Sequence, residues 1–166
     1  QTLVYDPDLV GTWQEGQEQW VFAGDPEEKS YQLTITEDDG RKSRLLAHLV
    51  AVEGRHFLDL YPFDEPEGGE WLKFHLLPVH LFFSVEKVDG TWKLSVMNPE
   101  AVDELLQEQP ERVKHERLES GRVVLTDTPE NLQAFLLAGL QTEDFFGDTE
   151  TLTPVEQESD PESESK

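Results

Sequence analysis

The chain has 166 residues, of which 13 are basic and 36 are acidic, so its formal net charge is −23. A surface this acidic repels phosphate groups, which argues against nucleic acids and anionic membranes as electrostatic partners. The sequence contains no cysteine, which excludes disulfides, thiolate metal sites and cysteine nucleophiles. At this length we expect one domain.

The N-terminal residue, Gln1, is not a translation start, because the only methionine of the sequence is Met97. We expect that a secretory leader has been removed before Gln1. An arbitrary boundary in a cytosolic protein is the alternative.

Between residues 15 and 98 the pattern predicts strands joined by hairpins. Tyr31, Leu33 and Ile35 alternate with polar residues, which is the period of a half-buried strand. The Asp-Gly pairs at 39–40 and 89–90 are typical of tight hairpin turns, whose two central residues need positive φ. Further strands are expected over 44–52, 56–61, 71–77, 79–88 and 91–97.

Two helices are expected in the C-terminal third. Asn98-Pro99-Glu100 and Thr128-Pro129-Glu130 each combine a capping side chain, a proline at the first helical position and an acid in the first turn. An apolar stripe follows each of these starts, so both helices should pack on the rest of the protein. A last strand is expected near 122–126.

Eight or nine consecutive strands favour a mainly β fold, an antiparallel up-and-down barrel, because closure removes the sheet edges. A β-sandwich is the alternative. We expect residues 1–148 to form this single domain, with 1–7 as an N-terminal tether. The acid-rich residues 149–166 are expected to form a largely disordered tail.

The segment Gly11-Thr12-Trp13 resembles the opening motif of the lipocalins and their calycin relatives. In that family the tryptophan closes one end of an eight-stranded barrel. The resemblance implies this role for Trp13, and it implies that Arg122 is the late arginine that stacks on the tryptophan.

Three longer segments, 57–62, 75–80 and 132–136, resemble those of uncharacterised bacterial lipoproteins. Those proteins carry a lipid on a cysteine at the mature N-terminus. The resemblance implies an extracytoplasmic protein, periplasmic or at the cell surface, which a removed N-terminal lipid anchor would tether to the membrane. It implies no activity.

Aromatic residues in neighbouring expected strands are candidates for the wall of an apolar pocket. The candidate ligand-binding residues are Trp13, Phe74, His80, Phe82 and Trp92. Among them His80, next to Phe82, would line the pocket and serve as a general base.

The pair His75 and His80 is the candidate for a metal-binding or catalytic site. Residues five apart point to opposite faces of an unbroken strand, so the two could share a metal only if Pro78 introduced a bulge. The chain also has no Gly-x-Ser-x-Gly elbow and no phosphate-binding glycine-rich loop. We therefore expect no metal, no cofactor and no enzymatic activity.

Asp59 lies between Leu58 and Leu60 in an apolar strand. A buried carboxylate without a partner is costly, so we expect a structural salt bridge. Arg44 is the first candidate partner, with Arg55 and Lys73 as alternatives.

These observations leave three functional hypotheses. The first is a barrel that binds a small hydrophobic molecule. The second is a non-enzymatic surface or interaction protein whose barrel is filled by side chains. The third is a hydrolase with a histidine and a carboxylate near Pro78. We expect a monomer with no nucleic-acid partner.

Overall fold

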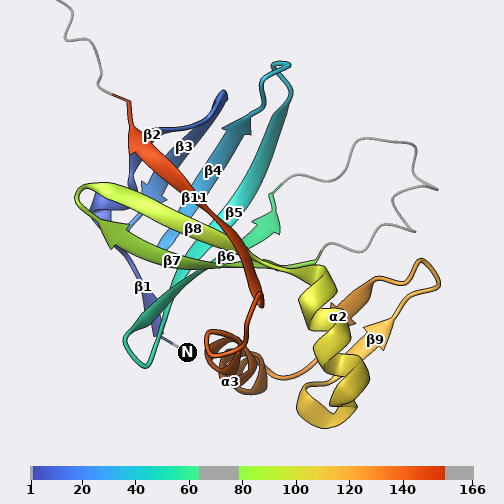
Figure 1. Ribbon diagram of the computed structural model, residues 1–166. Helices are drawn as coiled ribbons and strands as arrows, with labels where there is room; N and C mark the ends of the chain where they lie inside the picture. Colours follow the sequence, from blue (N-terminus) through green and yellow to red (C-terminus); the bar gives the residue numbers. More distant parts are fainter. Residues whose placement is uncertain (1, 64–78, 156–166) are drawn as a thin grey trace, which may run out of the picture.

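The computed structural model describes residues 2–63 and 79–155, and eight of its strands form a closed antiparallel barrel (Figure 1). Each barrel strand pairs with the next along the chain, and the last strand returns to pair with the first. The strands are β2 (Gly11–Glu15), β3 (Glu18–Asp25), β4 (Ser30–Thr36), β5 (Lys42–Val52), β6 (Arg55–Pro62), β7 (Leu81–Val88), β8 (Thr91–Met97) and β11 (Phe146–Pro154). This order confirms the predicted up-and-down barrel. The expected strand over 71–77 lies outside the described residues.

The N-terminal residues add one short strand to the eight strands of the barrel. Strand β1 (Thr2–Val4) pairs with residues 49–51 of β5, beyond the part of β5 that pairs with β4. The 3₁₀ helix η1 (Pro7–Leu9) follows. The segment expected to act as a tether therefore begins with an added strand.

The predicted turn at Asp89-Gly90 has the expected geometry, and the turn at Glu53-Gly54 between β5 and β6 shares it. At Glu53-Gly54 and Asp89-Gly90 both residues have positive φ, between 48° and 79°, as two-residue turns of this kind require. The turn at 39–40 differs, because it lies in a longer loop in which the Gly40 N–H donates to the Glu37 carbonyl at 2.9 Å.

The closing strand β11 was not expected. It runs across the expected domain boundary at residue 148, so the barrel domain extends to Pro154. The strand expected near 122–126 is instead β10 (Val123–Leu125), which pairs with β9 (His115–Arg117) in a separate two-stranded sheet. Residues 156–166 of the expected tail lie outside the described residues.

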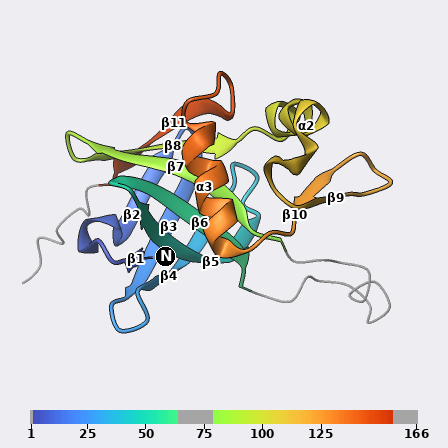
Figure 2. The same ribbon diagram turned by 90° about the horizontal axis from the view of Figure 1, so that it is seen from below.

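Both expected helices are present, in the C-terminal half of the chain. In α2 (Pro99–Glu108) the Asn98 side chain accepts from the Glu100 N–H, and in α3 (Pro129–Gly139) the Thr128 side chain accepts from the Asn131 N–H. Helix α3 lies across the outside of the barrel, and α2 lies beside β9 and β10 (Figures 1 and 2). Among the described helices, none is long and apolar enough to cross a bilayer.

The apolar side chains form two separate cores. The first fills the barrel and includes large aromatic residues of β2, β3, β4, β7 and β8. The second lies between the outside of the barrel and the helices. Strand β6 contributes to both, since Leu58 and Leu60 belong to the first core while Phe57 belongs to the second.

One end of the barrel is closed by η1. The Trp13 indole N–H donates to the Leu9 carbonyl oxygen at 2.9 Å, and Trp13 is 6% exposed. The Trp92 indole N–H reaches the Asp8 carbonyl at 3.4 Å. On the other side of η1, the buried Tyr31 hydroxyl accepts from the Asp6 N–H at 2.8 Å and donates to the Asp6 carbonyl at 3.1 Å. These bonds hold the N-terminal segment over the tryptophans.

Candidate functional site

A pocket of about 220 Å³ lies between helix α3 and the outer face of β5, β6 and β7. Its lining residues are Val50, Val52, Phe57, Asp59, His80, Phe82, Pro129, Leu132, Gln133 and Leu136. Most of this lining is apolar, and the polar side chains are few.

The strand pairing explains why these side chains meet. Asp59 is paired with Phe82 on β7, and Phe57 is paired with Val50 on β5, so all four side chains share the outer face of the barrel. From the opposite side, Leu132 and Leu136 are four residues apart and lie on one face of α3. The pocket is the space between these two surfaces.

Its polar group is an aspartate–histidine pair. Nδ1 of His80 lies 2.7 Å from Oδ1 of Asp59. The Asp59 side chain is 12% exposed and the His80 side chain is 52% exposed, so the histidine presents the pair to the exterior. Two aromatic rings lie near the His80 ring, with centroids 4.7 Å away for Tyr61 and 6.3 Å away for Phe82. Nε2 of His80 makes no hydrogen bond to any described residue.

The structure therefore gives Asp59 a partner that the sequence did not indicate. The register of β5 with β6 places His48 opposite Asp59, whereas Arg44 falls four residues away. The Arg44 guanidinium lies 5.7 Å from the centroid of the Phe63 ring. The expected salt bridge between Asp59 and Arg44 is replaced by the contact between Asp59 and His80, because an Arg44 partner would need a different register of β5 with β6. Lys73 lies outside the described residues.

The five candidate ligand-binding residues do not form one site. Trp13 and Trp92 are buried in the barrel core. His80 and Phe82 line the pocket on the outside. Phe74 lies outside the described residues. The candidate set is thus divided by the barrel wall.

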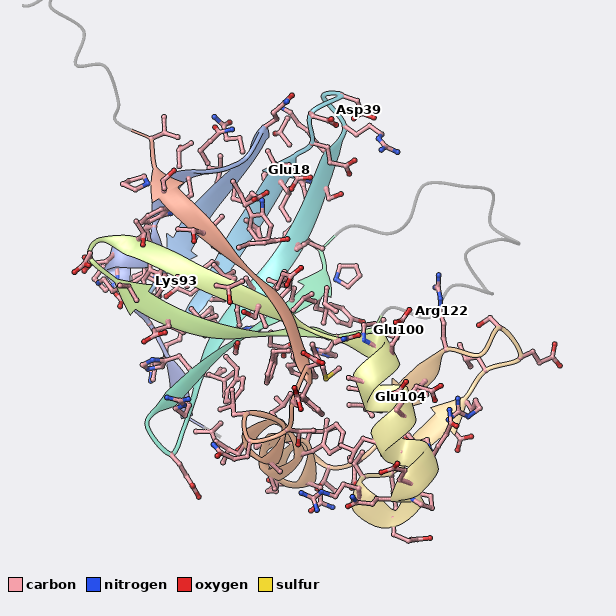
Figure 3. The ribbon with its side chains drawn as sticks, viewed as in Figure 1. Glu18, Asp39, Lys93, Glu100, Glu104 and Arg122 are labelled. Carbon is pink, nitrogen blue, oxygen red and sulfur yellow. The ribbon has the colours of Figure 1, made fainter. Side chains whose placement is uncertain are left out.

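Arg122, the expected counterpart of the stacking arginine, lies elsewhere. It belongs to the turn between β9 and β10, where its carbonyl accepts from the Leu118 N–H at 2.8 Å. Figure 3 shows its side chain extending from the β9–β10 hairpin. The barrel end that Trp13 closes is formed by η1, so the expected stacking is wrong.

The sequence did not identify the α3 side of the pocket. The apolar residues of this helix, including Leu132 and Leu136, were a clear signal that it packs on the protein. These apolar residues do not indicate which strands α3 packs against. The pocket residues Val50 and Val52 were likewise visible only as part of an apolar strand.

A second, wider groove of about 670 Å³ crosses the outside of the barrel from β6 to β11. Arg55 and Lys93 line it together with Glu86, which is paired with Lys93 across β7 and β8. Lys93 is labelled on β8 in Figure 3. The Ser95 and Thr149 hydroxyls in its floor are hydrogen-bonded to each other at 2.8 Å. Its charges alternate in sign along neighbouring strands, so they do not single out a ligand.

Acidic side chains gather at the barrel end away from η1. Glu15 and Glu18 are cross-strand partners, and Glu18 lies at the same end as Asp39 in Figure 3. Glu150 is exposed to solvent, but partial desolvation of its carboxylate, together with the carboxylates of Glu15 and Glu18, raises its pKa. Within residues 2–63 and 79–155, no three histidine or acidic side chains are placed to hold a metal ion.

No protein-family model matches the chain, and no curated protein or solved structure matches it either. The functional argument depends on the pocket and its aspartate–histidine pair.

Proposed function

We propose that this protein binds a small, neutral, largely apolar molecule in the pocket between α3 and the outer face of β5–β7. The observation that carries the proposal is the 220 Å³ apolar pocket with one aspartate–histidine pair in its wall. Concave apolar sites with a few polar groups are the usual form of small-molecule sites. An apolar cavity of about 150 Å³ accepts benzene, so this pocket suits a ligand of about nine or ten non-hydrogen atoms.

The aromatic side chains inside the barrel favour the pocket under α3, rather than the barrel interior, as the binding site. Trp13, Trp20 and Trp92 are each at most 6% exposed and pack together with Phe22 and Tyr31 in one core. A ligand in the barrel would have to displace some of these side chains. The pocket under α3 requires no such displacement.

The charges favour a neutral ligand. Asp59 contributes a carboxylate to the wall, and the whole chain has a net charge of −23. Both repel an anion, and the largely apolar wall contains no lysine or arginine among its described residues to compensate for that repulsion. A fatty-acid carboxylate is therefore a poorer candidate than an uncharged molecule.

The filled barrel also favours a second candidate function, a non-enzymatic surface or interaction protein. In that case the space under α3 would be a packing imperfection between a helix and a sheet. The two functions differ in one measurable property, saturable binding of a small apolar molecule.

The test is a calorimetric titration of the full chain with ethylbenzene, which has no polar group. Leu132→Trp places an indole into the pocket, and Ala134→Trp places the same indole on an exposed position of α3. We expect saturable binding to the parent chain and to Ala134→Trp, and none to Leu132→Trp. Absence of binding to the parent chain, or equal binding to both variants, would contradict the proposal and favour the interaction protein.

We further propose an extracytoplasmic location with a lipid anchor, which is supported by the resemblance of residues 57–62, 75–80 and 132–136 to bacterial lipoproteins. Intact mass spectrometry of the protein isolated from its host's membranes tests it. An acylated cysteine upstream of Gln1 is expected, and a protein recovered without lipid would contradict it.

A further inference from the structure

We propose that the His80–Asp59 pair makes the pocket selective for a ligand whose polar end donates a hydrogen bond, such as an alcohol or a phenol. This inference rests on the proposed function, since it describes the head group of the molecule bound there. It follows from which ring nitrogen of His80 carries the proton.

The tautomer is set by Asp59. An ionised carboxylate only accepts hydrogen bonds, so Nδ1 of His80, at 2.7 Å from Oδ1 of Asp59, carries the hydrogen between them. In the neutral imidazole Nε2 then has a free lone pair and acts as an acceptor.

The bond to Asp59 and two neighbouring rings favour one orientation of the His80 ring. Its centroid is 4.7 Å from that of Tyr61, and the Phe82 ring is nearly parallel to it, with an interplanar angle of 15°. His80 is part of the pocket lining, and Nε2 has no hydrogen-bond partner among the residues that the structure describes. A ligand hydroxyl that reaches Nε2 would donate to it while the apolar part of the ligand contacts Leu132 and Leu136.

Other charged or titratable groups near the pair are few in the described ranges. His48 is paired with Asp59 across β5 and β6, but it makes no hydrogen bond to the carboxylate. From α3, the pocket residue able to form hydrogen bonds is the uncharged Gln133. The Asp59 contact is thus the interaction that decides the hydrogen-bonding character of His80.

Matched probes test the inference. 4-Ethylphenol carries a donating hydroxyl, 4-ethylanisole replaces the hydroxyl hydrogen by a methyl group, and 4-ethylbenzoate carries an accepting anion. We expect the parent chain to bind 4-ethylphenol about five- to tenfold more tightly than 4-ethylanisole, the gain of roughly one hydrogen bond. The ratio of the two affinities should fall to about one in His80→Phe. It should be retained in His56→Phe, which alters an exposed histidine at the other end of β6.

The outcomes separate this inference from the proposed function. Equal affinity for the phenol and the ether in the parent chain would overturn the inference while leaving the pocket as a binding site. A preference for 4-ethylbenzoate would also overturn it, because it would show that Nε2 donates. If neither the phenol nor ethylbenzene binds, the proposed function fails and this inference fails with it.

The tautomer has its own spectroscopic signature. Nitrogen-15 chemical shifts of the His80 ring distinguish a protonated Nδ1 from a protonated Nε2. We expect the hydrogen on Nδ1 in the parent chain and a shift toward the Nε2-protonated form in Asp59→Ala. A ring protonated on Nε2 in the parent chain would contradict the assignment.

Discussion

Gly139, near the end of α3, lies directly against the ring of Phe145. A Cβ atom on this glycine would lie 2.2 Å from Cε1 of Phe145, which is 0% exposed and held between Phe135 and Phe146. In an exposed helix, replacing glycine by alanine stabilises the protein by about 1 kcal/mol. Here the overlap reverses the sign, and we expect Gly139→Ala to reduce the free energy of unfolding by about 1–3 kcal/mol.

Urea denaturation measures this effect, and Gly147→Ala is its control. The nearest atom to a Cβ at Gly147 is a carbonyl oxygen at 3.7 Å, which is an ordinary contact. We expect this variant to change the free energy of unfolding by less than about 1 kcal/mol. A Gly139→Ala protein as stable as the parent chain would show that Phe145 can move aside.

Trp13 is expected to stabilise the closed end of the barrel. Trp13→Phe removes the N–H that the Leu9 carbonyl accepts and leaves a smaller ring in a buried site. The unpaired carbonyl and the lost volume together should cost about 2–4 kcal/mol of unfolding free energy. Hydrogen exchange should also become faster in η1 and β2. Unchanged exchange there would mean that η1 is held without the indole.

Glu150 is expected to destabilise the native barrel at neutral pH. Its pKa is raised by partial desolvation and by Glu15 and Glu18, so its charged form is disfavoured in the folded state. This penalty is present above the raised pKa and disappears as the pH falls below the ordinary glutamate value of about 4.3. Glu150→Gln should therefore raise the midpoint of thermal unfolding at pH 7.

The pH dependence gives this prediction its control. The difference in unfolding midpoint between Glu150→Gln and the parent chain should shrink when both are measured near pH 4. Glu28→Gln, in the exposed turn between β3 and β4, should give no comparable difference at either pH. A variant difference independent of pH would indicate that charge is not the cause.

Asp127 organises the start of α3, which forms one wall of the pocket. Its carboxylate accepts from the Lys114 N–H at 2.7 Å, from the Asn131 side chain at 2.7 Å and from the Thr128 N–H at 2.8 Å, and these bonds lower its pKa. We expect Asp127→Ala to lower the unfolding midpoint and to speed hydrogen exchange in the first turn of α3. The effect should be present at neutral pH and be lost as the pH falls below the ordinary aspartate value of about 3.9 toward the lowered pKa.

A comparison with Thr128→Ala separates the effect of the Asp127 charge from the loss of a helix-capping hydrogen bond. Thr128→Ala removes the hydrogen bond to the Asn131 N–H and should cost about 1 kcal/mol. Because the threonine does not titrate in this range, its effect should not follow the pH dependence of Asp127→Ala. Parallel behaviour of the two variants would contradict the role assigned to the carboxylate.

The barrel was predictable because its signals are local. The alternation of apolar and polar residues in 31–35 and the turns at 53–54 and 89–90 depend only on neighbouring residues. They can therefore be recognised without knowledge of the tertiary structure. Strand β11 lacks such a signal, since in Phe146–Pro154 only Leu152 is fully buried and the preceding residues are acids and threonines. Its composition indicated a tail, whereas pairing with β8 and β2 makes it the closing strand.

The site was less predictable, because it depends on contacts between distant segments. The sequence indicates that Asp59 needs a partner, but the choice of His80 follows from the register of β6 with β7, which places His80, just before β7, beside Asp59. Similarly, the apolar face of α3 did not indicate the strands that it covers. Trp92 and Phe82 were reasonable pocket candidates, yet they lie on opposite sides of the barrel wall.

The central claim is that a small apolar ligand binds outside the barrel, under α3, and methyl-resolved NMR during an ethylbenzene titration tests it most directly. We predict saturable shifts for the methyl groups of Val52 and Leu132, which line the pocket, and none for those of Leu33 and Leu58 in the barrel core. Shifts confined to Leu33 and Leu58, or no saturable shift in any of the four residues, would contradict the account.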